Sequence, residues 1–323
     1  MLAAQVKDFG GPEMLVPVDL PDPVPGPGEV LIDVAYADTI FVETQVRSGW
    51  GREYFGATPP YVPGGGVAGV VAALGPDTPA DRLGRRVVSF VRGSYAQRAV
   101  APASSLTAVP DGLDLLTAAA LVHDGVTATG LLEHTAVGET DRVLITGASG
   151  GMGTLLVQLA HARGARVVGL ARGEAKLALV RELGADEVVD ATDPDWPSRA
   201  RHALGGTDGA AEVVLDGVGG ETGARAFTLT ADGGRFSAHG APSGGFAAVD
   251  PAEAELRGIT LFGIADVQFD EPTLRRLTAS ALTEAAQGRL RPVIGEVFTL
   301  ARAADAHAAV EGRGLVGKVL LRM

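Results

Sequence analysis

A glycine-rich turn between an apolar run and a helical segment has the clearest chemical signature in the chain. The run Val143-Leu144-Ile145 is followed by Thr146-Gly147-Ala148-Ser149-Gly150-Gly151-Met152-Gly153, and a helical pattern then extends to Ala162. Backbone N–H groups at a helix N-terminus bind pyrophosphate, and a glycine at position 150 leaves room for that group. We therefore predict a dinucleotide phosphate site made by Ala148, Ser149, Gly150, Gly151, Met152 and Gly153. The alternative is a turn with a purely structural role.

The residues about 20 positions further on indicate which dinucleotide is bound, because an NAD site places an acid there for the ribose 2′-hydroxyl. This chain has Ala171 at that position, followed by Arg172 and, one helical turn later, Lys176. Two cations favour a 2′-phosphate, so we predict NADPH as the cofactor. The alternative is that both are ordinary solvated cations at the start of a helix.

Composition excludes several other kinds of chemistry. The 323 residues contain no cysteine, which removes disulfides, iron–sulfur clusters, thiolate nucleophiles and cysteine-ligated zinc. The net charge of −12 disfavours nucleic acid as a partner. No uncharged apolar run approaches the roughly 18 residues of a membrane span, and the first residues do not resemble a secretory signal. We expect a cytoplasmic protein with no membrane or nucleic-acid partner.

The patterning that positions the turn divides the chain in two. Short β-branched runs at Glu29–Val34, Gly66–Leu74 and Arg86–Phe90, separated by turn residues, predict a small antiparallel barrel. From about Thr117 the pattern becomes helical.

Strands and helices then alternate. Apolar strands are predicted at 143–145, 167–170, 188–189, 213–215 and 235–237, with helices at 155–162 and 174–183. This alternation is typical of a doubly wound parallel sheet covered on both faces. The tail, with helices at 273–287 and 301–310 and a strand at 318–321, is expected to return to the first domain.

These features together resemble a known family, the zinc-independent quinone oxidoreductases of the medium-chain dehydrogenase/reductase superfamily. The resemblance runs from end to end. It is carried, besides the turn, by Phe9-Gly10-Gly11-Pro12-Glu13, Pro25-Gly26-Pro27-Gly28-Glu29-Val30-Leu31, Pro63-Gly64-Gly65-Gly66-Val67-Ala68-Gly69-Val70-Val71, Asp216-Gly217-Val218-Gly219-Gly220, Gly233-Gly234-Arg235-Phe236 and Gly317-Lys318-Val319-Leu320.

The resemblance implies an α/β protein with a GroES-like β-barrel catalytic domain at residues 1–120, completed by 264–323, and a Rossmann NADPH-binding domain at 121–263. It also implies an active-site cleft between the domains and a homodimer formed through edge strands, for which Gly258–Ile264 is the candidate. By position it further implies five residues near the cofactor: Thr127, Gly217, Val218, Gly240 and Lys318.

The chain departs from the family pattern in one segment of the first domain. Where relatives usually carry Gly-Val-Asn and a following Asp, this chain has Asp38-Thr39-Ile40 and Glu43. Loss of the Asn amide changes the hydrogen bonding available to the acceptor. We place Ile40 and Glu43 in the predicted substrate pocket.

A reduction without zinc needs hydride delivery and a source of protons. Tyr54, in the polar loop Trp50–Gly56, is the candidate side-chain donor; water is the alternative donor, and Tyr54 could instead only line the pocket. Trp50 could flank a planar ring. His123 precedes the Thr127 motif and could face the cleft, or could be a satisfied, partly buried histidine.

The function predicted from these residues is the NADPH-dependent reduction of a quinone or an α,β-unsaturated carbonyl, with Tyr54 and Thr127 as catalytic residues. One alternative is an enoyl or polyketide-pathway reductase. Another is a non-catalytic NADPH-binding protein that lost turnover through the changed Asp38–Glu43 segment.

Overall fold

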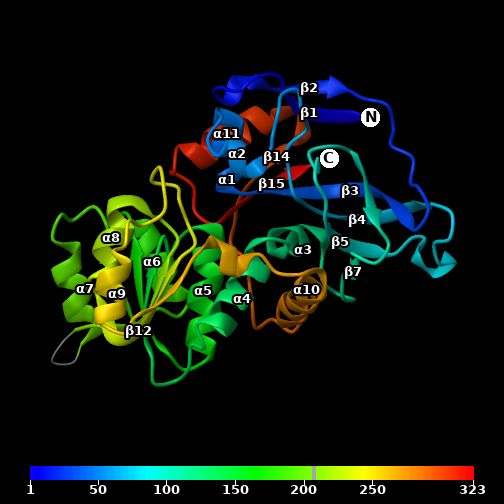
Figure 1. Cartoon of the computed structure of the whole chain (residues 1–323). Helices are drawn as coiled ribbons and strands as arrows, with labels where there is room; N and C mark the ends of the chain where they lie inside the picture. Colours follow the sequence, from blue (N-terminus) through cyan, green and yellow to red (C-terminus); the bar gives the residue numbers. More distant parts are fainter. Residues whose placement is uncertain (206–208) are drawn as a thin grey trace. The chain divides into compact units, whose positions relative to one another are not determined.

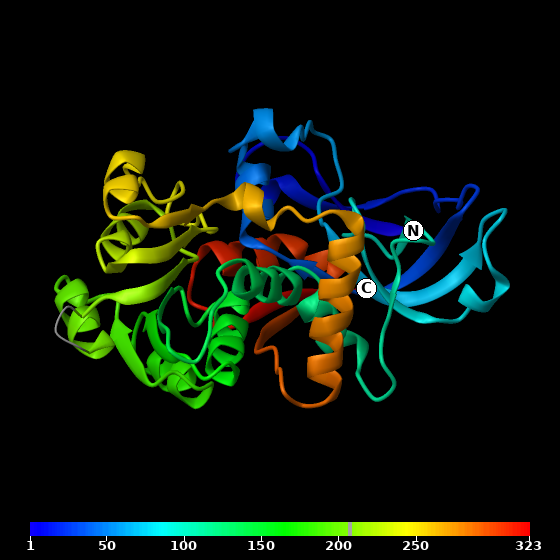
Figure 2. The ribbon, with the colours of Figure 1, turned by 60° about the horizontal axis from the view of Figure 1, so that its bottom comes forward.

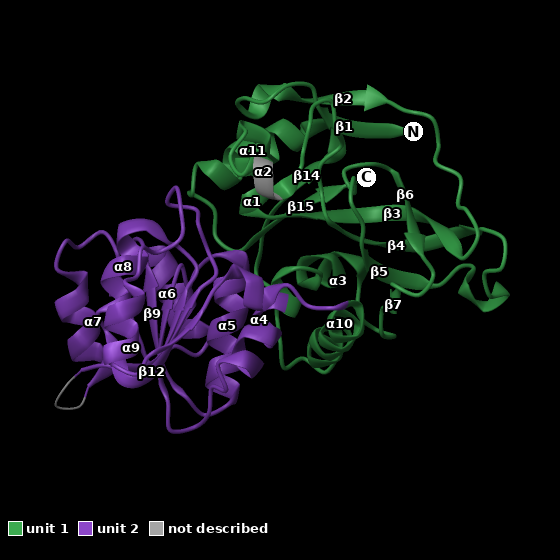
Figure 3. Cartoon of the chain, in the orientation of Figure 1, with its two compact units in different colours: residues 1–126, 271–323 green, residues 127–270 purple. Residues whose placement is uncertain are grey.

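The computed structural model describes residues 1–205 and 209–323, and the side chains of all of these except Glu53 and Tyr54. The described chain forms two compact units. Unit 1 contains Met1–Val126 and Glu271–Met323, and unit 2 contains Thr127–Asp270 (Figure 3). The borders expected from the sequence were near residues 120 and 264.

Unit 1 is built around a seven-stranded sheet with the order β14-β15-β3-β4-β5-β7, in which β6 also pairs with β3 (Figure 1). A separate pair, β1 and β2, is antiparallel. The strands are β1 (Leu2–Val6), β2 (Leu15–Asp19), β3 (Glu29–Thr39), β4 (Gly66–Leu74), β5 (Arg86–Phe90), β6 (Arg98–Pro102), β7 (Thr107–Ala108), β14 (Ile294–Thr299) and β15 (Lys318–Arg322).

The helices of unit 1 lie beside this sheet. They are α1 (Phe41–Ser48), α2 (Arg52–Phe55), α3 (Leu115–Leu121), α10 (Glu271–Ala286) and α11 (Ala303–Glu311), with 3₁₀ turns at Pro12–Met14, Ala80–Arg82 and Leu300–Arg302. Helix α10 runs alongside α3 (Figures 1 and 2).

One pair of strands from the tail of the chain departs from the antiparallel pairing that we predicted for the first domain. Strands β14 and β15 are parallel, whereas β15 and β3 are antiparallel. The reason is α11, which lies between them in sequence and acts as the crossover that parallel neighbours need. The expected return of the tail to the first domain is confirmed, because β15 pairs with β3.

The long strand β3 changes its buried face part-way along. Val30, Ile32 and Val34 alternate into one apolar cluster, whereas Ala37 joins a second cluster with Tyr95 and Phe298. The register with β4 shifts between Val34 and Tyr36, and such a shift reverses which side chains point to each face. The end of β3 therefore places Asp38 and Thr39 in the interior.

Unit 2 is a six-stranded parallel sheet with the order β10-β9-β8-β11-β12-β13, which confirms the predicted doubly wound fold. Its strands are β8 (Arg142–Thr146), β9 (Arg166–Ala171), β10 (Glu187–Asp190), β11 (Ala211–Asp216), β12 (Thr230–Ala238) and β13 (Thr260–Phe262). The helices are α4 (Asp124–His134), whose first three residues belong to unit 1, α5 (Gly151–Ala162), α6 (Glu174–Glu182), α7 (Trp196–Leu204), α8 (Gly220–Phe227) and α9 (Pro251–Leu256), followed by a 3₁₀ turn at Ile264–Val267.

Both faces of this sheet are covered. Val168 and Leu170 of β9 pack in one cluster with α7, α8 and α9. Gly169, between them, faces the opposite side, where Val180 of α6 lies so close that a Cβ on the glycine would come within 2.4 Å of it. The sheet order reverses between β8 and β11, so the carboxyl ends of these two strands form the crevice where ligands of such sheets bind.

No single helix in the described ranges is long and apolar enough to cross a bilayer; only α3 and α4 taken together, with a 44° bend between them, reach that length and composition.

Candidate functional site

The glycine-rich turn connects β8 to α5 as predicted. Gly147 adopts the left-handed conformation with φ +64°, and Gly150 is the N-cap of α5. Gly150 N–H donates to Gly147 O at 3.0 Å, which closes the turn. At Gly153 a Cβ would lie 2.2 Å from Gly147 O, so only glycine lets the first turn of α5 pack against this loop.

The N-terminus of α5 has open backbone donors. The first N–H bonded within the helix is that of Thr154, to Gly150 O, and no side chain caps the helix. Within residues 1–205 and 209–323, the N–H groups of Gly151, Met152 and Gly153 have no acceptor. A Cβ on Gly150 would meet only Gly147 O, at 3.4 Å, which is ordinary contact. The chain itself thus does not require glycine at 150, whereas a bound anion would.

The second strand end carries the two predicted cations. Ala171 ends β9, and Gly173, with φ +81°, is the N-cap of α6. Arg172 is exposed and Lys176 is half-buried. Burial and the charge of Arg172 lower the pKa of Lys176. The two cations are thus close enough to repel each other, and an anion between them would relieve that repulsion.

The loops after β11 and β12 meet at the same edge of the sheet. Asp216 Oδ1 accepts hydrogen bonds from Thr146 Oγ1 at 2.6 Å and from the N–H groups of Val218 and Gly219 at 3.1 Å. This links the ends of β8 and β11 across the point where the sheet order reverses. The predicted Gly217 and Gly240 touch, because a Cβ on Gly240 would lie 2.1 Å from Gly217 O.

His239, which follows β12, brings an unsatisfied polar atom to this edge. Its Nδ1 lies 3.2 Å from Ser237 Oγ, while the buried Nε2 has no hydrogen-bond partner in the described chain. Burial lowers the pKa of His239 to about 4, so the ring is neutral at physiological pH. Because Nε2 lies near Gly217 and lacks a partner, it fits a crevice in which a polar ligand supplies the missing hydrogen bond.

The predicted substrate residues Ile40 and Glu43 lie at the start of α1 in unit 1. Ile40 is half-buried, and its N–H donates to Glu43 Oε2 at 3.1 Å. Glu43 is 9% exposed, and its Oε2 also accepts a hydrogen bond from the Tyr95 hydroxyl at 2.7 Å. Burial, reinforced by the charge of Asp38, raises the pKa of Glu43 to about 7.

Glu43 is the end of a buried chain of hydrogen bonds. Arg47 Nε donates to His307 Nδ1 at 3.2 Å, so the hydrogen of this neutral ring is on Nε2, which lies 3.1 Å from the Tyr95 hydroxyl. Burial and the charge of Arg47 lower the pKa of His307 to about 3. Arg47 also donates to Gly10 O at 2.7 Å and pairs with Glu311.

A second buried cluster surrounds His123 and Lys318. Asp38 is fully buried, and its Oδ2 lies 2.7 Å from His123 Nδ1 and 3.3 Å from Lys318 Nζ. The Lys318 ammonium also lies 3.2 Å from Asp124 Oδ2 and is 3% exposed. Asp38 and Asp124 therefore surround the cation that the resemblance associates with the cofactor.

The other predicted residues are placed as follows. Trp50 is half-buried, with its ring centroid 6.2 Å from that of Phe55. Thr127 is half-buried in the second turn of α4 and belongs to unit 2. The Tyr54 side chain lies outside the described residues.

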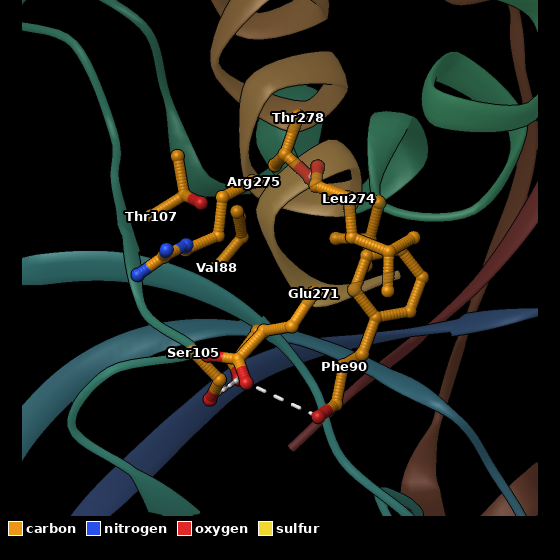
Figure 4. A pocket seen from close by; sticks show the side chains of 10 residues that line it. Val88, Phe90, Ser105, Thr107, Glu271, Leu274, Arg275 and Thr278 are labelled. Carbon is orange, nitrogen blue, oxygen red and sulfur yellow. Dashed lines mark hydrogen bonds between the residues drawn. The ribbon is translucent and has the colours of Figure 1, made fainter. Parts of the chain in front are cut away.

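A small pocket of unit 1 lies between α10 and the strands β5 and β7, and Glu271, Leu274, Arg275 and Thr278 face it from the helix (Figure 4). Phe90 lines it from β5. Among the predicted substrate residues whose side chains the structure describes, Ile40, Glu43, Trp50 and His123, none lines this pocket.

Sequence reasoning missed several polar residues that the fold gathers in unit 1. Tyr95, Arg47 and His307 were assigned no role, and Asp38 was noted only as a departure from the family. One signal was available, since Asp38 directly follows the run 34–37 and Lys318 directly precedes the apolar run 319–321, and a charge in such surroundings is buried only when it is paired.

Comparison with known proteins identifies the family. Residues 26–111 match the model described as the alcohol dehydrogenase GroES-like domain, and residues 151–279 match the zinc-binding dehydrogenase model. Quinone oxidoreductase of Mus musculus is 31% identical, with 99% of this chain and 97% of that protein aligned. The chain belongs to the quinone oxidoreductase family of the medium-chain dehydrogenase/reductase superfamily.

Two further relatives support this assignment to the quinone oxidoreductase family. A 2-haloacrylate reductase of Burkholderia sp is 30% identical over 99% of this chain and 98% of that protein. A mycobacterial protein solved as a complex with NADPH is 34% identical, with a TM-score of 0.92 and complete coverage of both chains. This member of the family is an oxidoreductase.

One matching family model is named for zinc binding, but the described residues do not offer a suitable set of zinc ligands. The sequence has no cysteine, and the described residues contain no group of three or more His, Asp or Glu side chains placed to hold a metal ion. Asp38 and His123 make only a pair, and Lys318 places a positive charge 3.3 Å from Asp38 that would repel a dication.

Proposed function

We propose that this quinone oxidoreductase family member uses NADPH to reduce an electron-poor acceptor, a quinone or an α,β-unsaturated carbonyl, without a metal ion. The observation that carries the proposal is the open N-terminus of α5, beside a glycine that the chain itself does not require. The names of the relatives support the acceptor class, since they include quinone oxidoreductases and a 2-haloacrylate reductase.

The residues that would hold the cofactor follow from this geometry. The free N–H groups of Gly151, Met152 and Gly153 would bind the pyrophosphate. The loops that carry Gly217, Val218 and Gly240 lie at the same edge of the sheet and would border the cofactor. When the cofactor is bound there, its reduced nicotinamide supplies a hydride, which is one proton with two electrons.

Arg172 and Lys176 would bind the ribose 2′-phosphate. Burial and the charge of Arg172 both lower the pKa of Lys176, and an anion bound by the two cations would offset both effects. Asp190 contacts this turn, where its Oδ1 accepts a hydrogen bond from Gly173 N–H at 3.4 Å. Asp190 Oδ1 also accepts hydrogen bonds from Thr192 N and Oγ1 at 2.9 Å, which reduces its capacity to bind a ribose hydroxyl.

Acceptors of this class suit a site without a Lewis acid. A quinone or enone is already electron-poor, so hydride transfer to it depends on positioning and hydrogen bonds rather than on polarisation by a metal. Alcohol oxidation, by contrast, is usually assisted in this superfamily by zinc, for which the described residues offer no donor set.

The test is steady-state oxidation of NADPH and NADH with 1,4-benzoquinone, 9,10-phenanthrenequinone and an enone, in the presence of a chelator. We expect turnover that survives chelation and that is faster with NADPH. Tight NADPH binding with no turnover on any acceptor would instead favour a non-catalytic role. Activity that is lost on chelation and restored by zinc would contradict the metal-free reaction.

A further inference from the structure

The cluster around Asp38 joins three segments of unit 1 that are far apart in the sequence. Asp38 comes from the end of β3, His123 from the junction of α3 and α4, and Lys318 from the start of β15. Two of these side chains are almost completely buried, at 0% and 3% exposure, whereas the His123 side chain is 21% exposed. The histidine is thus the member of the cluster that solvent can reach.

The hydrogen bond to Asp38 fixes the chemistry of the histidine ring. Because a carboxylate can only accept, Nδ1 must carry a hydrogen that it donates over 2.7 Å to Asp38 Oδ2. Nε2 has no hydrogen-bond partner in the described part of the chain. The reactive nitrogen is therefore Nε2, which is a base in the neutral ring and a proton donor in the imidazolium.

Close packing against glycine backbone and an aromatic ring holds the His123 ring in place. A Cβ on Gly65 would lie 3.0 Å from Nε2, and one on Gly66 would lie 2.7 Å from Asp38 Oδ1. The Phe90 ring, which also lines the pocket in Figure 4, packs edge-on against His123 with the ring centroids 4.8 Å apart. A ring that is held in place while its side chain stays 21% exposed is the arrangement that a proton-transfer group requires.

His123 and Lys318 together keep Asp38 in its charged form. Burial alone would raise the pKa of Asp38, but His123 and Lys318 lower it below its ordinary value. Burial would likewise lower the pKa of His123, and Asp38 overrides this effect and raises it. The charged groups that act on His123 are Asp38, Lys318 and Glu43, and Asp124 acts through its ion pair with Lys318. The ring thus holds its proton to a higher pH than an isolated histidine.

We propose that His123, oriented by Asp38, donates the proton that completes the reduction. The inference rests on the proposed function. In this step the acceptor first receives a hydride, which is one proton with two electrons, from the reduced dinucleotide. Its oxygen or α-carbon then forms a bond to the proton that leaves His123 Nε2. The electron pair of the broken N–H bond stays on the ring, which becomes neutral imidazole and regains a proton from water.

The same cluster could instead serve only to stabilise unit 1, since buried ion pairs can be structural. The two roles differ in pH dependence. A proton donor is active only while protonated, so turnover must fall as pH rises through the pKa of His123. If the ion pair is only structural, the activity of the folded enzyme does not fall as pH rises through the pKa of His123.

The decisive experiment compares His123→Gln and Asp38→Asn with the wild type, using an enone as acceptor, because its reduction ends on a carbon that must be protonated. The matched control is His202→Gln, the same change at an exposed position of α7. We expect kcat to fall by about 10²-fold to 10⁴-fold in His123→Gln, with an unchanged Kd for NADPH. The decrease of kcat at alkaline pH should disappear in this variant. The control should match the wild type.

Asp38→Asn tests the positioning role of the carboxylate. Without the negative charge the pKa of His123 should fall, so the decrease of kcat should move to lower pH. Titration of the His123 ring by NMR should show the same shift independently of turnover. Melting temperatures and NADPH binding establish that each variant is folded.

The outcomes separate this inference from the proposed function. An active wild type whose His123→Gln variant keeps its kcat and its pH profile would overturn the donor role alone. A His123 ring whose pKa does not respond to Asp38→Asn would also overturn it. A wild type with no turnover on any acceptor would overturn the proposed function, and the donor role with it.

Discussion

Gly150 and Gly153 lie in the same turn but are glycine for different reasons. At Gly153 a Cβ would clash with Gly147 O at 2.2 Å and with Ala148 Cα at 2.8 Å. At Gly150 a Cβ has space, and φ of −77° is accessible to any residue. The first glycine therefore leaves room for a ligand, and the second allows the chain to pack.

Alanine at each position should separate binding from stability. Gly153→Ala should lower the free energy of unfolding by about 1–3 kcal/mol, because the clashing atoms belong to backbone that cannot move aside freely. Gly150→Ala should keep the melting temperature of the wild type but weaken NADPH binding by about tenfold or more. Thermal melts and fluorescence titration with NADPH measure both. Wild-type affinity in Gly150→Ala would show that no phosphate lies against this residue.

The cations at the start of α6 should determine the choice of cofactor. Replacing Arg172 and Lys176 with Ala should raise the Kd for NADPH by about 10²-fold, at roughly 1.4 kcal/mol for each lost charge-assisted contact, and leave the Kd for NADH nearly unchanged. Arg181→Ala, on the same helix but paired with Glu174, is the control. Equal losses for the two dinucleotides would contradict a 2′-phosphate site.

At the scale of elements, the buried chain from Arg47 to Glu43 connects α1 and α11 with the segment that carries Tyr95. Burial raises the folded-state pKa of Glu43 to about 7, above its ordinary value of 4.5. The native state thus binds a proton that the unfolded state has already released. The contribution of Glu43 to stability is full below pH 4.5 and is lost as pH rises through about 7.

Glu43→Gln should remove this dependence on pH. The amide oxygen can still accept hydrogen bonds from the Tyr95 hydroxyl and from Ile40 N–H, but the side chain no longer titrates. We expect the melting temperature of the wild type to fall relative to that of Glu43→Gln between pH 5 and pH 8. A difference that stays constant over this range would show that Glu43 does not titrate there.

The elements themselves were largely predictable. Strands β4 and β5 have the predicted bounds, and α6 and α10 end within a residue or so of theirs. These elements could be predicted because the apolar periodicity, and the glycines that end the helices, are local features of the sequence. The parallel β14–β15 pair and the inward turn of Asp38 were not predicted, because each depends on a distant partner strand or on a shift of register.

The candidate site likewise has a part that could be predicted from the sequence and a part that could not. The phosphate turn could be predicted because one local segment provides both the strand end and the helix N-terminus. The pairing of Asp38 with His123, 85 positions apart, and of Arg47 with His307, 260 apart, could not. Such pairs depend on how the strands and helices pack, and a single sequence does not record that directly.

At the scale of the whole molecule, the resemblance predicts a homodimer formed through the outer strand of unit 2. Strand β13 ends the six-stranded sheet, and its Leu261 is 38% exposed. An exposed apolar edge strand is available for pairing with a second copy. We propose that the segment Gly258–Ile264 forms this contact.

Light scattering after size-exclusion chromatography tests the dimer. We expect a wild-type mass of two chains and a shift to monomer in Leu261→Lys, since the substitution places like charges opposite each other at a two-fold contact. Leu256→Lys, at a side chain that is 88% exposed on α9, should remain dimeric. A monomeric wild type, or a dimeric Leu261→Lys variant, would contradict the predicted interface.

We propose that the protein transfers the reducing power of NADPH to a quinone without a metal. The most direct measurement is an anaerobic single turnover, in which chelator-treated protein loaded with NADPH is mixed with 1,4-benzoquinone. We expect that the near-ultraviolet absorbance of NADPH disappears and that one hydroquinone forms for each NADPH consumed. NADPH that stays bound and unoxidised, or oxidation that occurs only after zinc is added, would contradict it.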